Sequence, residues 1–250
     1  MKNRGAQITI FVIVGFLIVL LVILAFVFRQ TIQTESPSDL GPREFIRGCV
    51  EDSVEESVLK ILDGGGKIIP DKTIFYQGAE YNYLCYQGDY YLSCYNLYPD
   101  LTGIVEEEIY LDTKDSVQKC FDLMREDFED RNYDVDGGAS DYSIKLLPGK
   151  IRINLKKDIS ISKGETSMRF NNFDSEVLSP LNELVGIARE IVNDEAAYCN
   201  FEYVGYMILH PEYDLMRTSY KDSRIYNVKD RNSGYDFKFA VRSCAFPAGL

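Results

Sequence analysis

Residues 8–28 read ITIFVIVGFLIVLLVILAFVF, an uncharged stretch in which 18 of the 21 residues are Leu, Ile, Val or Phe. As a helix it would be about 31 Å long, which matches the hydrocarbon thickness of a bilayer. A helix that is apolar on every face is not typical of a globular core. The stretch therefore predicts one transmembrane helix from Ile8 to Phe28, with residues 1–29 forming a cytoplasmic stub and this anchor.

The residues around the anchor predict its orientation. Lys2 and Arg4 precede it, Arg29 follows it, and no acidic residue occurs before Glu35. Because positive charge is retained on the cytoplasmic side, we expect a cytoplasmic N-terminus and an extracytoplasmic C-terminal domain. A cleaved secretory signal would have an apolar region of only about 7–15 residues before a small-x-small site. Ala25-Phe26-Val27 offers no such site, so we expect a single-pass protein of the cell membrane.

The chain beyond the anchor is polar and acidic. Residues 30–41, which include Ser36-Pro37-Ser38, predict a short tether, and residues 42–250 are long enough for one large domain with its own core. The whole chain carries a net charge of −12, and without Lys2, Arg4 and Arg29 it has 24 basic against 39 acidic residues, a net charge of −15. Such a surface repels phosphate groups, which excludes nucleic acid as a partner.

Six cysteines follow the anchor, and none lies in a C-x-x-C pair. His210 is the only histidine, so the clustered ligands of a zinc site are absent from the sequence, and we expect no metal or other cofactor. An even number of cysteines in an exported domain predicts three disulfides. Buried free thiols are the alternative, since free cysteine is common in protein cores.

Local pattern suggests how the cysteines pair. Cys85 and Cys94 flank a Gly-Asp turn between aromatic segments, and a four-residue loop over Gly88 to Tyr91 would place them opposite each other in a hairpin. Cys49 and Cys120 each lie on the apolar stripe of a predicted helix, so they could join the two helices. Cys199 and Cys244 then remain as the third pair. The predicted pairs are Cys49–Cys120, Cys85–Cys94 and Cys199–Cys244.

Hydrophobic periodicity predicts about three amphipathic helices. The first runs from Pro42 to Asp63 and ends at Gly64-Gly65-Gly66. The second runs from Leu101 to Arg131, with an interruption near Asp112, and the third follows an apolar stripe from Val177 to Val192. Tyrosines that alternate with polar residues predict antiparallel hairpins over residues 68–98. Further strands are expected at Tyr142–Leu147, Lys150–Lys157, Ile159–Ser162, Thr166–Phe173, Tyr203–Leu209, Arg224–Val228 and Tyr235–Arg242. The order predicts an α+β domain with antiparallel sheet.

Two segments resemble known groups of proteins. Residues Arg4-Gly5-Ala6-Gln7-Ile8-Thr9-Ile10-Phe11 resemble the start of many archaeal exported single-span proteins and that of type IV prepilins. In prepilins the chain is cleaved after the glycine, and the apolar helix then builds a filament core. The sequence departs from bacterial-type pilins at Ile10, where those proteins carry a glutamate.

A second resemblance covers most of the chain. Gly48-Cys49-Val50-Glu51-Asp52, Lys119-Cys120-Phe121 and the ending Phe239-Ala240-Val241-Arg242-Ser243-Cys244 are similar to a group of uncharacterised archaeal exported proteins. The motifs are short, and the resemblance implies an exported domain but no activity.

Candidate sites are few. Asp134, Asp136 and Asp141 surround two glycines and could gather oxygen ligands for calcium, although the EF-hand spacing is missing and a polar turn is the simpler interpretation. His210 has no nucleophile beside it and fits a structural or surface residue. Glu106-Glu107-Glu108 is typical of a solvated helix face. The tyrosine-rich hairpins are the best interaction candidates, although alternation turns about half of the rings into the core. The residues are Tyr81, Tyr83, Tyr86, Tyr90, Tyr91 and Tyr95.

The sequence contains no catalytic signature. The first hypothesis is therefore a non-enzymatic envelope protein that is held by the membrane through Ile8 to Phe28 and acts by contact with other envelope proteins or with copies of itself, as a pilin-like subunit would. The alternative is an extracellular hydrolase whose carboxylates the sequence does not pair. A ligand-sensing ectodomain is a third hypothesis.

Overall fold

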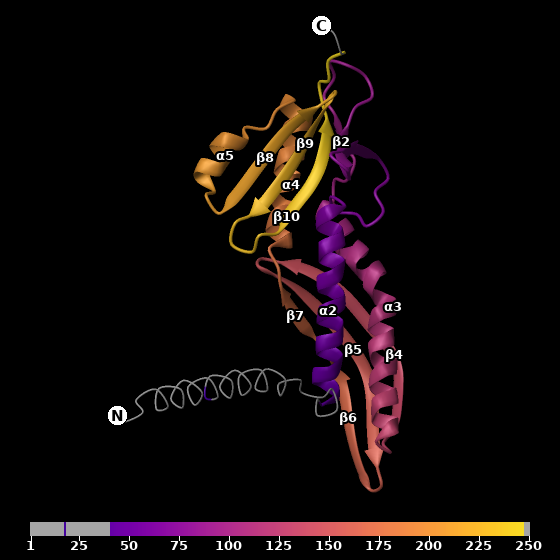
Figure 1. Ribbon diagram of the computed structural model, residues 1–250. Helices are drawn as coiled ribbons and strands as arrows, with labels where there is room; N and C mark the ends of the chain where they lie inside the picture. The colour runs from indigo at the N-terminus through magenta and orange to yellow at the C-terminus, as the bar shows by residue number, and fades with distance from the viewer. Residues whose placement is uncertain (1–17, 19–40, 248–250) are drawn as a thin grey trace, which may run out of the picture. The chain divides into compact units, whose positions relative to one another are not determined.

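The computed structural model in Figure 1 describes residues 41–247 and the single position Ile18. The expected anchor from Ile8 to Phe28 and the tether over residues 30–41 lie outside the described residues, apart from Ile18 and Gly41. Within the described part, no helix has both the length and the apolar character needed to cross a bilayer. The chain from Pro42 onward forms one compact unit.

Two long helices lie side by side, α2 (Pro42–Asp63) and α3 (Leu101–Asp130). The helices run antiparallel, since Cys49 of α2 is bonded to Cys120 of α3, with Cα atoms 5.9 Å apart, whereas Lys60, later in α2, pairs with Asp112, earlier in α3. Each buries one apolar stripe, as the periodicity of the sequence predicts. The buried apolar residues are Ile46, Val50, Val54, Val58, Ile61 and Leu62 in α2, and Leu101, Val105, Ile109, Val117, Cys120, Phe121, Met124 and Phe128 in α3.

The expected interruption of the second helix near Asp112 is wrong, because α3 is continuous there. Its polar residues at this level have partners that keep them compatible with a helix. The carboxylate of Asp112 pairs with Lys60 of α2 at 3.1 Å, and the hydroxyl of Thr113 donates to the carbonyl of Ile109 at 2.6 Å. The polar residues near Asp112 therefore bind α3 to α2 and do not interrupt the helix.

A sheet of four antiparallel strands packs against these helices. Along its central strand every second side chain is buried, which confirms the alternation seen in the sequence: Ile151, Ile153, Leu155, Ile159 and Ile161. Two of the predicted strands, Lys150–Lys157 and Ile159–Ser162, are in fact one continuous strand. The strands, in spatial order, are β4 (Asp134–Leu147), β5 (Lys150–Lys163) and β6 (Thr166–Asn172), and β7 (Ser175–Leu178) also pairs with β5.

A second sheet has six strands. Neighbouring strands are antiparallel except β2 and β10, which pair in parallel and bring residues near position 83 beside residues near position 240. The predicted α+β class with antiparallel-rich sheets is confirmed, with this one parallel pair added. The strands are β1 (Thr73–Tyr76), β2 (Ala79–Tyr86), β10 (Asp236–Arg242), β9 (Ser223–Asp230) and β8 (Tyr213–Tyr220) in spatial order, and β3 (Tyr95–Asn96) also pairs with β2.

Helix α4 (Leu181–Tyr198) packs on one face of the six-stranded sheet, against β9 and β10. The predicted stripe begins too early, because Val177 and Leu178 belong to strand β7. Pro180 lies between the two elements as the cap of α4. The residue before a proline is disfavoured in helical conformation, which is why the helix begins only after this point.

The segment Tyr203–Leu209 is a helix, α5, and the expected strand there is wrong. Tyr203, Tyr206 and Met207 are the residues of α5 that pack against the core, and their i, i+3, i+4 spacing is helical. The described part of the chain thus has four helices against the three expected. Strand β8, which comes after α5, is absent from the sequence prediction, because polar residues such as Asp214 and Arg217 interrupt its apolar positions at the edge of the sheet.

Candidate functional site

The six candidate tyrosines fall into two groups. Tyr81, Tyr83 and Tyr86 lie on β2, where Tyr83 is 5% exposed and packs with Ile74 and Ala240 in a small core, while Tyr81 and Tyr86 are half-buried against it. The hydroxyl of Tyr83 shares a hydrogen bond with Ser223 at 2.8 Å, and burial raises the pKa of this phenol. This first group therefore stabilises the sheet.

The second group is exposed. Tyr90 and Tyr91 are 43% and 56% exposed in the loop of residues 87–94, and Tyr95 is 71% exposed on β3. The ring of Phe246, in the C-terminal tail, meets the ring of Tyr91 edge-on with centroids 5.4 Å apart. Such large exposed apolar groups gathered at one place are typical of interaction sites. We call the group of Tyr90, Tyr91, Leu92 and Phe246 the aromatic tip.

The loop is held by the C-terminal tail and not by its own hairpin. The amide of Tyr91 donates to the carbonyl of Ala245 at 3.0 Å, and the amide of Cys244 donates to the carbonyl of Leu92 at 2.8 Å. The expected four-residue loop with Cys85 opposite Cys94 is wrong, since the residue opposite Cys85 is Asn96. Residues 87–94 form a longer loop outside the hairpin ladder, and Tyr91 and Leu92 bond to the tail instead.

Two disulfides brace the tip. Cys85–Cys94 closes the base of the loop and Cys199–Cys244 joins the tail to the end of α4, with Cα separations of 5.4 Å and 5.7 Å. Together with the bond between α2 and α3, these are the three pairs expected from the sequence, and they leave no free cysteine in the described residues. Disulfides limit the conformations that the connected segments can adopt. The loop and the tail are therefore fixed relative to the sheet.

Arg242, at the end of β10, lies under the tip. Its guanidinium is over the rings of Tyr86 and Tyr90, at 5.6 Å and 5.2 Å from their centroids, and it donates to the carbonyl of Gln87. Its Nε donates to Asp222 at 2.8 Å. Burial by itself would lower the pKa of Arg242, but the hydrogen bond and the charge of Asp222 raise it above its ordinary value. The side chain therefore stays charged and stacks beneath the loop.

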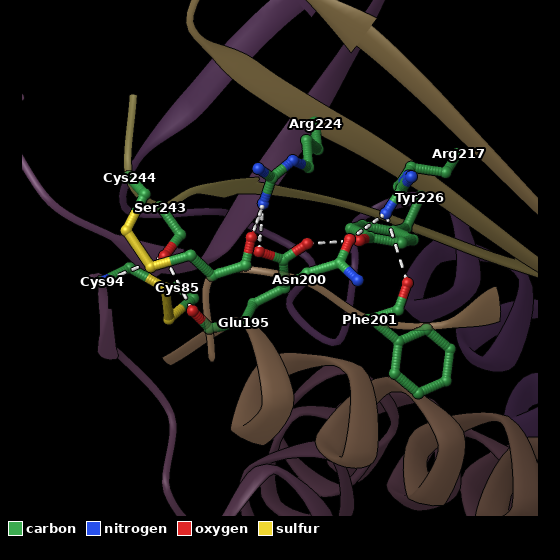
Figure 2. Close-up of polar contacts among 11 residues, drawn as sticks. Cys85, Cys94, Glu195, Asn200, Phe201, Arg217, Arg224, Tyr226, Ser243 and Cys244 are labelled. Atoms are coloured by element: carbon green, nitrogen blue, oxygen red, sulfur yellow. Dashed lines mark hydrogen bonds and ion pairs between the residues drawn. A yellow bond between two sulfur atoms is a disulfide. The ribbon is translucent and has the colours of Figure 1, made fainter. Parts of the chain in front are cut away.

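A buried carboxylate lies near the disulfides of this region, and Figure 2 shows its contacts. Glu195 of α4 is fully buried, and its carboxylate accepts hydrogen bonds from Arg224 and Tyr226 of β9. Burial first, and the adjacent charge of Glu195 second, raise the pKa of Tyr226, so this phenol stays a donor. The network thus fixes the C-terminal end of α4 to the sheet.

Ser243 connects this network to the tip. Its hydroxyl donates to the main-chain carbonyl of Glu195 at 2.7 Å and accepts from the amide of Cys94 at 3.1 Å. Figure 2 places Ser243 between the two disulfides, with Cys244 next to it along the chain. One hydroxyl therefore joins α4 to the loop and the tail that form the tip.

The other candidates have different surroundings. Asp134, Asp136 and Asp141 lie in strand β4 and not in a calcium loop or a polar turn, because Gly138 and Ala139 form a bulge within a continuous strand. Among the residues that the structure describes, no three His, Cys, Asp or Glu side chains are placed to hold a metal ion. His210 stacks on Tyr206 with ring centroids 4.3 Å apart.

The acidic run of α3 is more than a solvated face. Glu106 accepts from the amide of Leu146 at 2.9 Å and from Lys145 at 2.6 Å, which ties α3 to β4. Glu108 accepts from the amide of Ile68 at 3.1 Å. These carboxylates are structural, and neither is directed at the tip.

Several residues of the tip region are not evident from the sequence. Leu92 follows two tyrosines and Phe246 lies between Ala245 and Pro247, and neither belongs to a periodic pattern. Glu195 resembles any other acid in an amphipathic helix. Arg242 gives one signal, since it is the only charged residue in the run Phe239-Ala240-Val241-Arg242-Ser243-Cys244. A charge inside a buried strand needs a partner, and here the partner is Asp222.

Comparison with known proteins assigns no family. No family model, curated protein or solved structure matches the chain. The functional proposal therefore rests on the geometry and chemistry of the site.

Proposed function

We propose that the chain is a membrane-anchored extracytoplasmic protein of the cell envelope, which acts by binding another envelope protein through its aromatic tip. The observation that carries the proposal is the exposure of Tyr91, Leu92 and Phe246 on a segment that two disulfides and the Arg242 side chain hold fixed. Rigid aromatic groups bind with a small loss of conformational entropy, which suits a recognition surface.

The position of the tip supports this role. The predicted tether joins the domain at Pro42, and α2 extends from there for about 33 Å. At its other end, Asp63 pairs with Lys238 of β10 at 2.9 Å, and β10 continues to Arg242 under the tip. Figure 1 shows the start of α2 and the C-terminal tail at opposite ends of this unit. A domain tethered at Pro42 would present the tip away from its point of attachment.

The uncharged run from Ile8 to Phe28 and the three disulfides support the location. Such a run inserts into a bilayer, and disulfides persist in oxidising compartments outside the cytoplasm. Protease added to intact cells should remove the domain while the anchor stays with the membrane fraction. Recovery of the full-length chain in the soluble cytosol, with its thiols reduced, would contradict the proposal.

The contact itself is tested by site-specific photo-crosslinking in the native membrane. A photo-reactive residue at Tyr91 should give discrete adducts with another envelope protein, and the adducts should be lost in Phe246→Ser. The matched control carries the probe at Phe75, which is 63% exposed on β1 and outside the tip. Equal adducts from both positions, or none from Tyr91, would contradict a role for the tip.

One outcome would favour another of the hypotheses. Adducts that contain only copies of this chain, with a mature N-terminus at Ala6 or Gln7, would support a pilin-like subunit. The hydrolase alternative stays a prediction, and Asp136 and Asp158 are two acidic residues that line one cavity, on the four-stranded sheet.

A further inference from the structure

A surface cavity of about 650 Å³ lies on the four-stranded sheet, in a different part of the domain from the aromatic tip. It is lined by residues of β4, β5 and β6, and its volume is in the range of sites that bind small molecules. The polar lining residues are Asp136, Asp158, Ser160, Arg169 and Asn171.

Two bulges at the same level form the cavity. The register between β4 and β5 shifts between Gly137 and Ser140, and the register between β5 and β6 shifts between Lys156 and Ile159. Asp158 is therefore without a ladder partner on either side. Bulges redirect side chains and are frequent beside functional sites. Their coincidence on both sides of β5 opens the sheet surface at Asp158.

The lining groups share one face. Asp136 is opposite Ser160, and Ser160 is opposite Arg169, so the three residues form a row across three strands. Adjacent strands are about 4.8 Å apart, which separates the backbones of Asp136 and Arg169 by about 10 Å. Among the described residues, neither charge has an ion-pair partner, and neither does Asp158. Asp136 and Arg169 therefore lie at the two ends of the row, with the smaller Ser160 between them.

The chemistry of these groups selects the ligand. A carboxylate only accepts hydrogen bonds and a guanidinium only donates them, whereas a hydroxyl does both. Among the described residues, no three acidic side chains are placed to hold a metal ion, and a phosphate or an acidic sugar would be repelled by Asp136 and Asp158. A neutral polyol satisfies all three groups, because neighbouring hydroxyls donate to the acids and accept from the base. We propose that this cavity binds a neutral sugar unit of a glycan chain.

One glycine allows a direct test of the site. A Cβ placed on Gly138, which lines the cavity, would meet no atom within 4 Å. A leucine at this cavity-lining position would add bulk to the site without displacing the core. Gly48, exposed on α2, has equally open surroundings and lies outside the cavity, so Gly48→Leu is the matched control.

The full-length protein is purified in a detergent without a sugar headgroup and titrated calorimetrically with maltose, cellobiose and mannobiose. Saturable binding of at least one disaccharide is expected. Gly138→Leu should abolish it, Asp158→Asn and Arg169→Gln should each weaken it at least tenfold, and Gly48→Leu should leave it unchanged. Tyr91→Ser, in the aromatic tip, should also leave it unchanged, which separates this site from the proposed function.

Three results would overturn the proposal. The first is that none of the three disaccharides binds. The second is that binding persists in Gly138→Leu. The third is that glycine, tested as a zwitterion whose ammonium and carboxylate could also satisfy the acids and the base, binds while the sugars do not.

Discussion

The carboxylate of Glu195, which has no exposed surface, pairs with the guanidinium of Arg224 across the interface between α4 and the six-stranded sheet. Arg224 also donates to the carbonyl of Cys199 at 2.8 Å, the half-cystine that holds the C-terminal tail. A buried charge is stable only with such partners, since moving it out of water is costly. The pair therefore stabilises both the core of the domain and the base of the tip.

Removal of the arginine should be strongly destabilising. In Arg224→Met, Glu195 would keep its burial but lose its counter-charge, and we expect the free energy of unfolding to fall by about 3 kcal/mol. Arg152→Met is the matched control, because Arg152 pairs with Glu176 at the surface, 3.2 Å apart, and should cost less than about 1 kcal/mol. Urea unfolding followed by tyrosine circular dichroism measures both. Similar losses in the two variants would contradict the prediction.

The disulfides should differ in their contributions to stability. They close loops with sequence separations of 71, 45 and 9 residues for Cys49–Cys120, Cys199–Cys244 and Cys85–Cys94. Chain entropy gives about 4.4, 4.0 and 2.6 kcal/mol in that order. Replacement of each pair by serine and thermal unfolding without reductant should reproduce this ranking. A larger loss from the shortest loop than from the longest would show that another effect dominates.

These cysteines illustrate what the sequence can predict. The apolar stripes of α2 and α3 can be predicted from the sequence, because 3.6-residue periodicity is a local property. These stripes place Cys49 and Cys120 on facing surfaces. The conformation of the loop between Cys85 and Cys94 cannot be predicted from local sequence, because it depends on hydrogen bonds to Ala245 and Cys244, about 150 residues away. Long-range pairing of this kind leaves no pattern in a single sequence.

The same reason applies to the site. All three tyrosines of β2 lie in or against a small core, and the exposed tyrosines lie beyond the strand, so alternation along β2 does not separate the two groups. It also gives no information on the tail that completes the tip with Phe246. Gly137 and Gly138 lie among aspartates, a pattern that favours a turn as much as a bulge. Only the pairing of β4 with β5 decides between them.

Acid should release the loop of the tip. Burial alone would raise the pKa of Asp222, but the hydrogen bond and charge of Arg242 lower it below its ordinary value of 3.8. A carboxyl with a lowered pKa stabilises the folded state fully above that ordinary value, and this stabilisation is lost as the pH falls through the lowered pKa. Near-UV circular dichroism of the tyrosines should therefore change below about pH 4.

Asp222→Asn should reproduce the acid effect at neutral pH. The asparagine oxygen can still accept from Arg242, but without the negative charge the bond is weaker. A loss of about 1.4 kcal/mol would make amide exchange in residues 87–94 roughly tenfold faster. Asp214→Asn is the control, because Asp214 pairs with Arg231 at an exposed site, 3.6 Å apart. Unchanged exchange in Asp222→Asn would show that Arg242 does not hold the loop through Asp222.

Two glycines associated with α2 should respond to alanine in opposite directions. Gly65, just after the helix, has φ +60°, and a Cβ there would lie 2.7 Å from the carbonyl oxygen of Lys238 on β10. Left-handed backbone with a side chain costs about 1–2 kcal/mol, and the contact adds to it, so Gly65→Ala should lower the free energy of unfolding by at least about 2 kcal/mol. Gly48, exposed within α2 and free of neighbours within 4 Å, should gain about 0.8–1 kcal/mol on the same substitution. Thermal unfolding of both variants tests the pair, and a stabilised Gly65→Ala would mean that this glycine does not set the junction between α2 and β10.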